Sequence, residues 1–315
     1  MTDTILYIVV PCYNEKEVLR ETAKRLKEKI YTLSDKNLIS KESKILFVND
    51  GSKDNTWEII TSLHEEDKVF SGVCLSKNRG HQNALLAGLM TAKNYADVVI
   101  SMDADLQDDI NAVDDMIEKY SEGFDIVYGV RSSRKTDTFF KRNTALLFYK
   151  MMNLLGAETV YNHADYRLMT KRALEGLAEF EEVNLFLRGL VPMIGYKTTT
   201  VEYERAERFA GESKYPFKKM LAFAIDGITS LSIKPITLIT RLGLFISCIS
   251  LFALIYTLIK YFLNQTVLGW SSLMASVWLL GGLQLFAIGI IGEYIGKIYK
   301  ETKRRPRYII SETLI

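Results

Sequence analysis

The chain has 315 residues, and its hydrophobic fraction of 48% is enough for a packed core in one large or two ordinary domains, which excludes a mainly disordered protein. Its 40 Lys and Arg residues nearly balance 38 Asp and Glu residues, so it lacks the basic excess of a nucleic-acid-binding protein. Three cysteines without a CxxC pair and three widely spaced histidines exclude a disulfide framework and argue against a zinc site.

The first 200 residues alternate short β-branched runs with longer amphipathic stretches, a pattern that predicts a mostly parallel sheet between helices. The expected strands are Ile5–Val10, Lys44–Asn49, Gly72–Leu75, Val98–Met102 and Asp125–Val130. The expected helices are Glu15–Leu33, Asn55–Glu66, Gln82–Asn94 and Ile110–Tyr120. Because ligands of open α/β sheets bind beyond the carboxyl ends of the strands, the loops after these strands are where a site is expected.

Three of these loops carry acidic and amide side chains, over residues 11–15, 49–54 and 103–108. Asp54 is explained equally well as the N-cap of the following helix. Asp103 and Asp105 would repel each other unless a cation lay between them, and Mg²⁺ or Mn²⁺ takes oxygen ligands of this kind. Since the chain has neither GxGxxG nor a P-loop, the pattern predicts a nucleoside diphosphate held through a divalent cation.

Charged residues become rare after about Lys219. Leu242–Ile259 and Tyr261–Gly292 contain no charge at all, and each is long enough to cross a bilayer core of ~30 Å. These runs predict a transmembrane helical hairpin, about 240–262 and 270–292. Lys and Arg cluster before the first run and after the second, so the positive-inside rule places the amino-terminal domain and both termini in the cytoplasm.

Two basic segments lie between the sheet and the hairpin. The segment 131–142 carries five Lys and Arg residues, and it is interpreted either as a site for a lipid phosphate or as a solvated basic face. Arg205–Lys219 contains Gly211 and is predicted to be a mobile flap that closes over phosphates. Phe217–Ile233 is predicted to be an interfacial amphipathic helix.

The polar loops resemble the signature loops of family 2 glycosyltransferases with the GT-A fold. The matching segments are Val10–Glu15, Asn49–Ser52 with Asp54, and Asp103–Gln107. Four further segments are similar to the bacterial polyprenyl-phosphate glycosyltransferases, relatives of dolichol-phosphate mannose synthase: Ser76–Gln82, Asp165–Met169, Arg208–Phe209 with Gly211–Tyr215, and Ile291–Gly296. The resemblance covers nearly the whole chain.

The resemblance implies an α/β fold, in which a GT-A nucleotide-sugar-binding domain is followed by interfacial helices and a two-helix transmembrane hairpin. The implied domains are a cytoplasmic catalytic domain over 1–205, the flap and interfacial helices over 206–238, the two transmembrane helices over 239–293, and a basic cytoplasmic tail over 294–315. The chain is then a multi-pass protein of the bacterial inner membrane.

The implied activity is that of an inverting transferase, which moves a hexose from a UDP-sugar to undecaprenyl phosphate at the cytoplasmic face. Glucose and N-acetylglucosamine are the expected sugars, and the product would be a lipid-linked donor for modifying cell-envelope glycans. Two alternatives stay open. A processive polysaccharide synthase would normally need more spans and a QxxRW motif, which is absent here. A non-catalytic membrane scaffold could bind the nucleotide sugar and recruit a flippase.

Site residues carry over from the resemblance position by position. Nucleotide-sugar contacts are expected from Pro11, Tyr13, Glu15, Asn49, Asp50, Asp103, Arg208 and Lys214. Metal ligands are expected from Asp103, Asp105 and Gln107, and lipid-phosphate contacts from Arg131 and Arg142. Asn49 stands where many members have an acidic residue, although an amide can also hydrogen-bond uracil.

Asp105 and Asp165 are the expected catalytic residues, and Asp165 resembles the candidate base of the family. A phosphate monoester has a second pKa of ~6 and hardly needs a base at neutral pH, so Asp165 could instead orient the sugar or pair with Arg167. His81 is interpreted as a helix cap or a sugar hydrogen-bond donor. A homo-oligomer, a flippase and a downstream glycosyltransferase are further expected partners, and nucleic acid is not.

Overall fold

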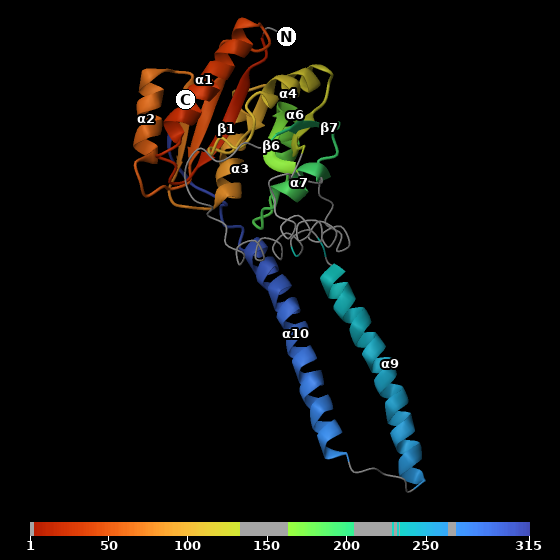
Figure 1. Cartoon of the computed structure of the whole chain (residues 1–315). Coiled ribbons are helices and arrows are strands. Elements are labelled where there is room, and N and C mark those ends of the chain that lie inside the picture. The colour runs from red at the N-terminus through yellow and green to blue at the C-terminus, as the bar shows by residue number, and fades with distance from the viewer. Residues whose placement is uncertain (1–2, 133–162, 205–228, 230–231, 233, 264–268) are drawn as a thin grey trace.

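The computed structural model describes residues 3–132, 163–204, 229, 232, 234–263 and 269–315 (Figure 1). The strands are β1 (Leu6–Cys12), β2 (Lys44–Asn49), β3 (Phe70–Leu75), β4 (Val98–Ser101), β5 (Ile126–Arg131), β6 (His163–Thr170), β7 (Thr198–Tyr203) and β8 (Ile310–Leu314). The helices are α1 (Leu19–Asp35), α2 (Thr56–Glu66), α3 (His81–Ala92), α4 (Ala112–Ser121), α6 (Lys171–Ala178), α7 (Leu187–Met193), α9 (Lys234–Phe262) and α10 (Trp270–Thr302).

The described strands form one mixed sheet in the order β7-β5-β6-β4-β1-β2-β3-β8, in which only β6 and β8 run against the others. The mostly parallel sheet is therefore confirmed, and the expected strands match to within two residues at each end. Cys12 lies opposite Asn49 and Val9 lies opposite Ser101 in the ladders. Because of this register, the loops after β1, β2 and β4 leave the sheet at the same edge.

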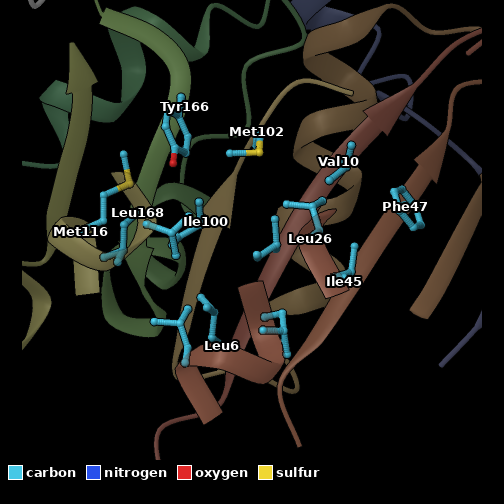
Figure 2. Packing of buried hydrophobic residues seen from close by; sticks show 14 of the residues in the cluster. Leu6, Val10, Leu26, Ile45, Phe47, Ile100, Met102, Met116, Tyr166 and Leu168 are labelled. Carbon is cyan, nitrogen blue, oxygen red and sulfur yellow. The ribbon is translucent and has the colours of Figure 1, made fainter. Parts of the chain in front are cut away.

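Helices cover both faces of the sheet, as the alternation of buried residues along the strands requires. Leu6, Ile8 and Val10 of β1 pack on the side of α1, α2 and α4, whereas Tyr7 and Val9 pack on the side of α3, α6 and α7. Figure 2 shows the first of these cores, with Leu26 of α1 beside the strands. Burial of each such apolar side chain stabilises the fold by about 1.5 to 3 kcal/mol relative to exposure. The sheet edge that carries the polar loops is therefore part of a well-packed domain.

The helix expected at Glu15 begins later, at Leu19. Asn14 adopts a left-handed backbone conformation, with φ of 54°, and the residues around it form a turn rather than a first helical turn. This difference matters for the site, because the turn carries Tyr13 and Glu15.

The predicted helical hairpin is present as α9 and α10, which project from the domain (Figure 1). Both helices expose large apolar side chains, including Phe252 (72% exposed) on α9 and Leu285 (72% exposed) on α10. Among the described residues, one segment, Leu279–Thr302 within α10, is long and apolar enough to cross a membrane, with a mean hydropathy of 1.5. A second crossing by α9 stays a prediction.

The carboxy-terminal segment differs from the expected tail over 294–315. α10 continues to Thr302, and residues 310–314 return to the sheet as β8, antiparallel to β3. The indole Nε1 of Trp57 donates a hydrogen bond to Glu312 Oε2 at 3.1 Å. Without β8, β3 would present an open sheet edge, which folded proteins commonly cover. The tail is therefore part of the domain.

Two predicted elements cannot be compared with the structure. The flap over Arg205–Lys219 and almost all of the interfacial helix over Phe217–Ile233 lie outside the described residues, as do Arg208, Lys214 and Arg142.

Candidate active site

The loops after β1 and β2 are bound to each other. The Asn14 backbone amide donates to Ser52 Oγ at 3.0 Å, and the Lys53 amide donates to Asn14 Oδ1 at 2.8 Å. The Glu15 amide donates to Thr56 Oγ1 at 3.0 Å. This reciprocal bonding fixes partly buried Tyr13 and Glu15 at the sheet edge. Pro11 is buried within β1, in register with Val48.

Asn49 and Asp50 have internal partners. Asn49 Oδ1 accepts a hydrogen bond from the Ser52 amide at 3.1 Å, and its Nδ2 lies 3.2 Å from Cys74 Sγ. The Asp50 carboxylate accepts bonds from the Arg79 and Gly80 amides at 2.7 and 2.9 Å. Burial raises the pKa of Asp50, and these two amides partly offset the shift. Asp50 thus joins the β2–α2 loop to the β3–α3 loop, and Asn49 joins its own loop to β3. Nucleotide contacts by these two residues stay a prediction.

Gly51 explains how closely these two loops approach. Its φ is +60°, and a Cβ atom there would lie 2.5 Å from the backbone nitrogen of Asn78. Only glycine fits both the conformation and the space.

Asp103 and Asp105 follow β4 at the same edge, as predicted. Asp105 Oδ1 accepts a hydrogen bond from the Gln107 amide at 3.2 Å, so the loop bends back on itself. Partial loss of hydration raises the pKa of the Asp103 carboxyl; His81 opposes the shift, and the nearby Asp165 and Asp105 carboxylates increase it. This excess of negative charge is the setting in which a bound cation stabilises a protein.

Within the described residues, no group of three or more His, Cys, Asp or Glu side chains is arranged to hold a metal ion. A complete protein cage is not needed, since Mg²⁺ usually binds through one or two carboxylates together with substrate phosphates and water. Asp103 and Asp105, with the side-chain oxygen of Gln107 in the same loop, fit that kind of site.

Asp165 faces this loop from β6. Arg167 on the same strand is in register with Ser101 of β4, and Ser101 Oγ donates to the Asp165 carbonyl at 2.6 Å. The Asp165 carboxylate is paired with the guanidinium of Arg167 and, through Nη2 at 3.0 Å and Nε at 3.3 Å, with that of Arg188. Burial alone would raise the pKa of Asp165, but Arg188 and Arg167, with help from His81, lower it well below its usual range.

This geometry bears on the roles considered for Asp165. A general base must take up a proton near neutral pH, and a carboxylate held ionised by two guanidinium groups is poorly suited to do so. The ion pair with Arg167 is confirmed. Arg188 was missed by sequence reasoning; the one signal for it is a charge within the apolar run Phe186–Val191.

His81 connects the two acidic positions. Its Nε2 lies 3.6 Å from Asp103 Oδ1 and 3.7 Å from Asp165 Oδ2. It is the first residue of α3, after Gly80. The imidazole is thus placed at the centre of the carboxylate cluster, where a sugar hydroxyl could be bound, and no cap hydrogen bond from a side chain is formed at this helix start.

Arg131 belongs to an adjoining network that the sequence did not indicate. Its Nε donates to the Tyr203 hydroxyl at 3.4 Å, its Nη2 lies 4.0 Å from Asp108 Oδ1, and Tyr203 donates to the same oxygen at 2.6 Å. Burial, followed by the charge of Asp103, raises the pKa of Asp108 to about 6. The Arg131 side chain is 27% exposed, so a ligand in solvent can reach it while Tyr203 and Asp108 hold it in position.

A mixed α/β sheet with carboxylates gathered at the carboxyl ends of its strands is the arrangement expected of a GT-A-like glycosyltransferase domain. Residues 7–177, more than half of the chain, match Glycosyl transferase family 2, and residues 234–298 match the GtrB C-terminal hairpin. The chain therefore belongs to glycosyl transferase family 2, in the polyprenyl-phosphate glycosyltransferase group with this hairpin, and it is an enzyme.

Full-length relatives agree with this assignment. The glycosyltransferase YkoT of Bacillus subtilis, itself uncharacterized, is 58% identical over 97% of this chain and 91% of its own length. The SfII prophage-derived bactoprenol glucosyl transferase of Shigella flexneri is 40% identical over 97% of each chain. Among solved structures, the mannosyltransferase PcManGT of Pyrobaculum calidifontis, in complex with GDP-Man and Mn²⁺, aligns over 96% of this chain and 88% of its own with a TM-score of 0.46 and 15% identity. That similarity is too low to transfer its donor or its ion.

Proposed function

We propose that the enzyme transfers a hexose, with glucose the first candidate, from a UDP-sugar to a polyprenyl phosphate at the cytoplasmic membrane surface. One observation carries the proposal: Asp103 and Asp105 share a sheet edge with an Asp165 that is ion-paired with Arg167 and Arg188, in a domain continuous with the long apolar helix α10. The naming of a 40% identical relative as a bactoprenol glucosyl transferase supports the acceptor and the sugar.

In this reaction an oxygen of the lipid phosphate attacks the anomeric carbon, and the bond from that carbon to UDP breaks. Because the acceptor is already mostly a dianion at pH 7, no residue has to remove a proton from it. A divalent cation bound by Asp103, Asp105 and Gln107 would supply neutralising charge for the diphosphate leaving group. His81 would hold a sugar hydroxyl, and Asp165 would keep Arg188 oriented toward the cluster. Attack opposite to the departing UDP inverts the anomeric configuration.

The test is a transfer assay with the purified full chain, labelled UDP-glucose, UDP-galactose or UDP-N-acetylglucosamine, and undecaprenyl phosphate. We expect a lipid-linked hexose with glucose as the best donor. Transfer only from UDP-N-acetylglucosamine would show that the sugar is not glucose. Hydrolysis or binding of the UDP-sugar without a lipid-linked product would contradict the proposed acceptor.

The membrane topology is also a proposal. β8 pairs with β3, so residues 310–314 and the catalytic domain must lie on one side of any membrane, and an even number of crossings must separate them. Two crossings, by α9 and α10, fit this condition. A reporter fused before Met1 and one fused after Ile315 should both report a cytoplasmic location, whereas one inserted after Gly269 should report the outside. Opposite locations for the two ends would contradict the hairpin topology.

Arg131 is proposed to contact the acceptor phosphate. Arg131→Ala should raise the apparent KM for the lipid by about 10- to 150-fold, since a charge-assisted hydrogen bond contributes ~1.5 to 3 kcal/mol, and should change the KM for the UDP-sugar far less. Tyr203→Phe is the matched control, because it removes the hydroxyl next to Arg131 but keeps the cation. Equal effects on both substrates, or equal effects of both variants, would show that Arg131 has a structural role.

A further inference from the structure

A pocket of about 240 Å³, rich in basic side chains, lies where the end of α10 meets the catalytic domain. Five of the residues that line it are cationic: Arg79, Lys300, Lys303, Arg305 and Arg307. The other lining residues are Asn83, Val183, Tyr299 and Pro306, so no carboxylate of the described residues belongs to the lining. A concave site with cations from two distant parts of the chain is suited to an anion.

The walls of this cavity, here called the basic pocket, are fixed by specific contacts. Glu301 accepts hydrogen bonds from the Val183 and Asn184 backbone amides, both at 2.8 Å, which attaches the end of α10 to the loop before α7. Arg304 has a left-handed conformation, with φ of 45°, and turns the chain back toward the domain. Arg307 Nη1 then donates to the Phe180 carbonyl at 2.9 Å. The basic pocket is therefore preformed.

Among the described residues, no carboxylate neutralises the cations of the basic pocket. In the part of the chain that the structure describes, none of the five has a carboxylate oxygen within 4.0 Å, and the oxygens of Glu301 are occupied by the Val183 and Asn184 donors. Two atoms of lining residues, Arg79 Nε and Asn83 Oδ1, are shielded from solvent and have no hydrogen-bond partner among the described residues. The cations of the basic pocket would therefore be balanced by a ligand with anionic oxygens.

The position of the basic pocket indicates the source of such a ligand. Tyr299, Lys300 and Lys303 stand at the carboxyl end of the apolar segment Leu279–Thr302, which is where a span meets the headgroup layer. Lysines at the end of a span can simply extend to the membrane surface. That explanation does not account for Arg79, which comes from the β3–α3 loop, or for the returning turn that brings in Arg305 and Arg307.

We propose that the basic pocket binds the phosphate of an anionic membrane phospholipid, of the phosphoglycerol type. Arg79 and Asn83 flank His81 at the start of α3, and the Arg79 amide binds Asp50. An occupied pocket would hold the catalytic loops at a set height and orientation relative to the bilayer. The proposal depends on membrane association of the chain, and it does not depend on the identity of the donor or the acceptor.

The experiment measures the melting temperature of the detergent-purified full chain while short-chain phosphatidylglycerol, phosphatidylcholine or inorganic phosphate is added. A ligand of the folded state raises the melting temperature in proportion to its saturation. We expect phosphatidylglycerol to stabilise the protein and phosphatidylcholine not to. In the variant with Lys300→Ala, Lys303→Ala and Arg305→Ala, the apparent affinity for phosphatidylglycerol should fall by about 100-fold, since each basic residue at an anionic surface contributes about 1 kcal/mol.

The matched control replaces three exposed lysines distant from α10, with Lys24→Ala, Lys36→Ala and Lys41→Ala, and should keep the lipid response. A cooperative melting transition without added lipid verifies that each variant is folded. Calorimetry of UDP binding is recorded separately, so that a failed lipid site and a failed proposed function are distinguished. If the triple variant does not fold, Arg305→Ala alone should weaken the lipid response by about fivefold. An unchanged lipid response in the variants, or stabilisation by inorganic phosphate but not by phosphatidylglycerol, would overturn the proposal.

Discussion

Asp105→Asn is expected to reduce glycosyl transfer by about 1,000-fold, because a neutral amide cannot replace a carboxylate that holds the cation at the leaving diphosphate, a contribution of several kcal/mol. The same change should weaken the binding of Mn²⁺ and of UDP. Both effects arise from one position, since Asp105 lies in the loop that directly follows β4 and is bent back by its bond with the Gln107 amide.

Calorimetry of Mn²⁺ and UDP binding, together with the transfer rate, measures this result. Asp109→Asn is the matched control, because Asp109 lies in the same loop, loses the same charge and makes a local bond to the Asn111 amide at 2.9 Å. The control should bind Mn²⁺ and UDP like the wild type. An Asp105→Asn protein that also binds both like the wild type would rule out the metal assignment.

Asp165→Asn should instead lower stability and activity through the loss of its ion pairs with Arg167 and Arg188. Arg167 is 1% exposed, and removing the charge of its partner leaves a buried guanidinium uncompensated, which costs about 3 to 5 kcal/mol of stability. Transfer should be lost, while Mn²⁺ and UDP binding by the folded fraction should change little. A double-mutant cycle with Arg188→Gln should be strongly non-additive, because the two side chains are in contact.

The dependence on pH gives a second measurement of the same pair. The folded pKa of Asp165 is lower than the unfolded value of ~3.9, so the carboxylate stabilises the fold fully above that value. The stabilisation is lost as the pH falls through the folded pKa. Melting curves between about pH 3 and pH 8 should therefore show a constant difference in stability between the wild type and Asp165→Asn above about pH 5, and this difference should begin to narrow only as the pH falls below about 4.

The pH–rate profile then separates the two roles of Asp165. If the lipid phosphate attacks without the help of a base, the residual activity of the Asp165→Asn variant should still fall in acid with a midpoint near the phosphate pKa of ~6. If the acidic limb disappears in that variant, Asp165 is a general base after all.

The sequence alone determined the features that depend on local periodicity and on loop chemistry. The strands β1 to β5 follow from short β-branched runs, and the positions of Asp103 and Asp105 follow from the rule that ligands bind at strand ends. The hairpin of α9 and α10 follows from two charge-free runs, whose composition is visible without any contact. The family resemblance rests on the same loops.

Only the tertiary structure decided which groups meet from distant positions. Three contacts join segments that no sequence period connects. β8 pairs with β3, Arg188 forms an ion pair with Asp165, and Arg79 and Arg305 line the same pocket. Asn49 and Asp50 were expected to contact the nucleotide because they match a family motif, and only the folded structure shows that both also have internal hydrogen-bond partners. Whether a polar side chain serves a ligand or the fold depends on the donors and acceptors that the rest of the chain brings within hydrogen-bond distance, and those are fixed only when the chain is folded.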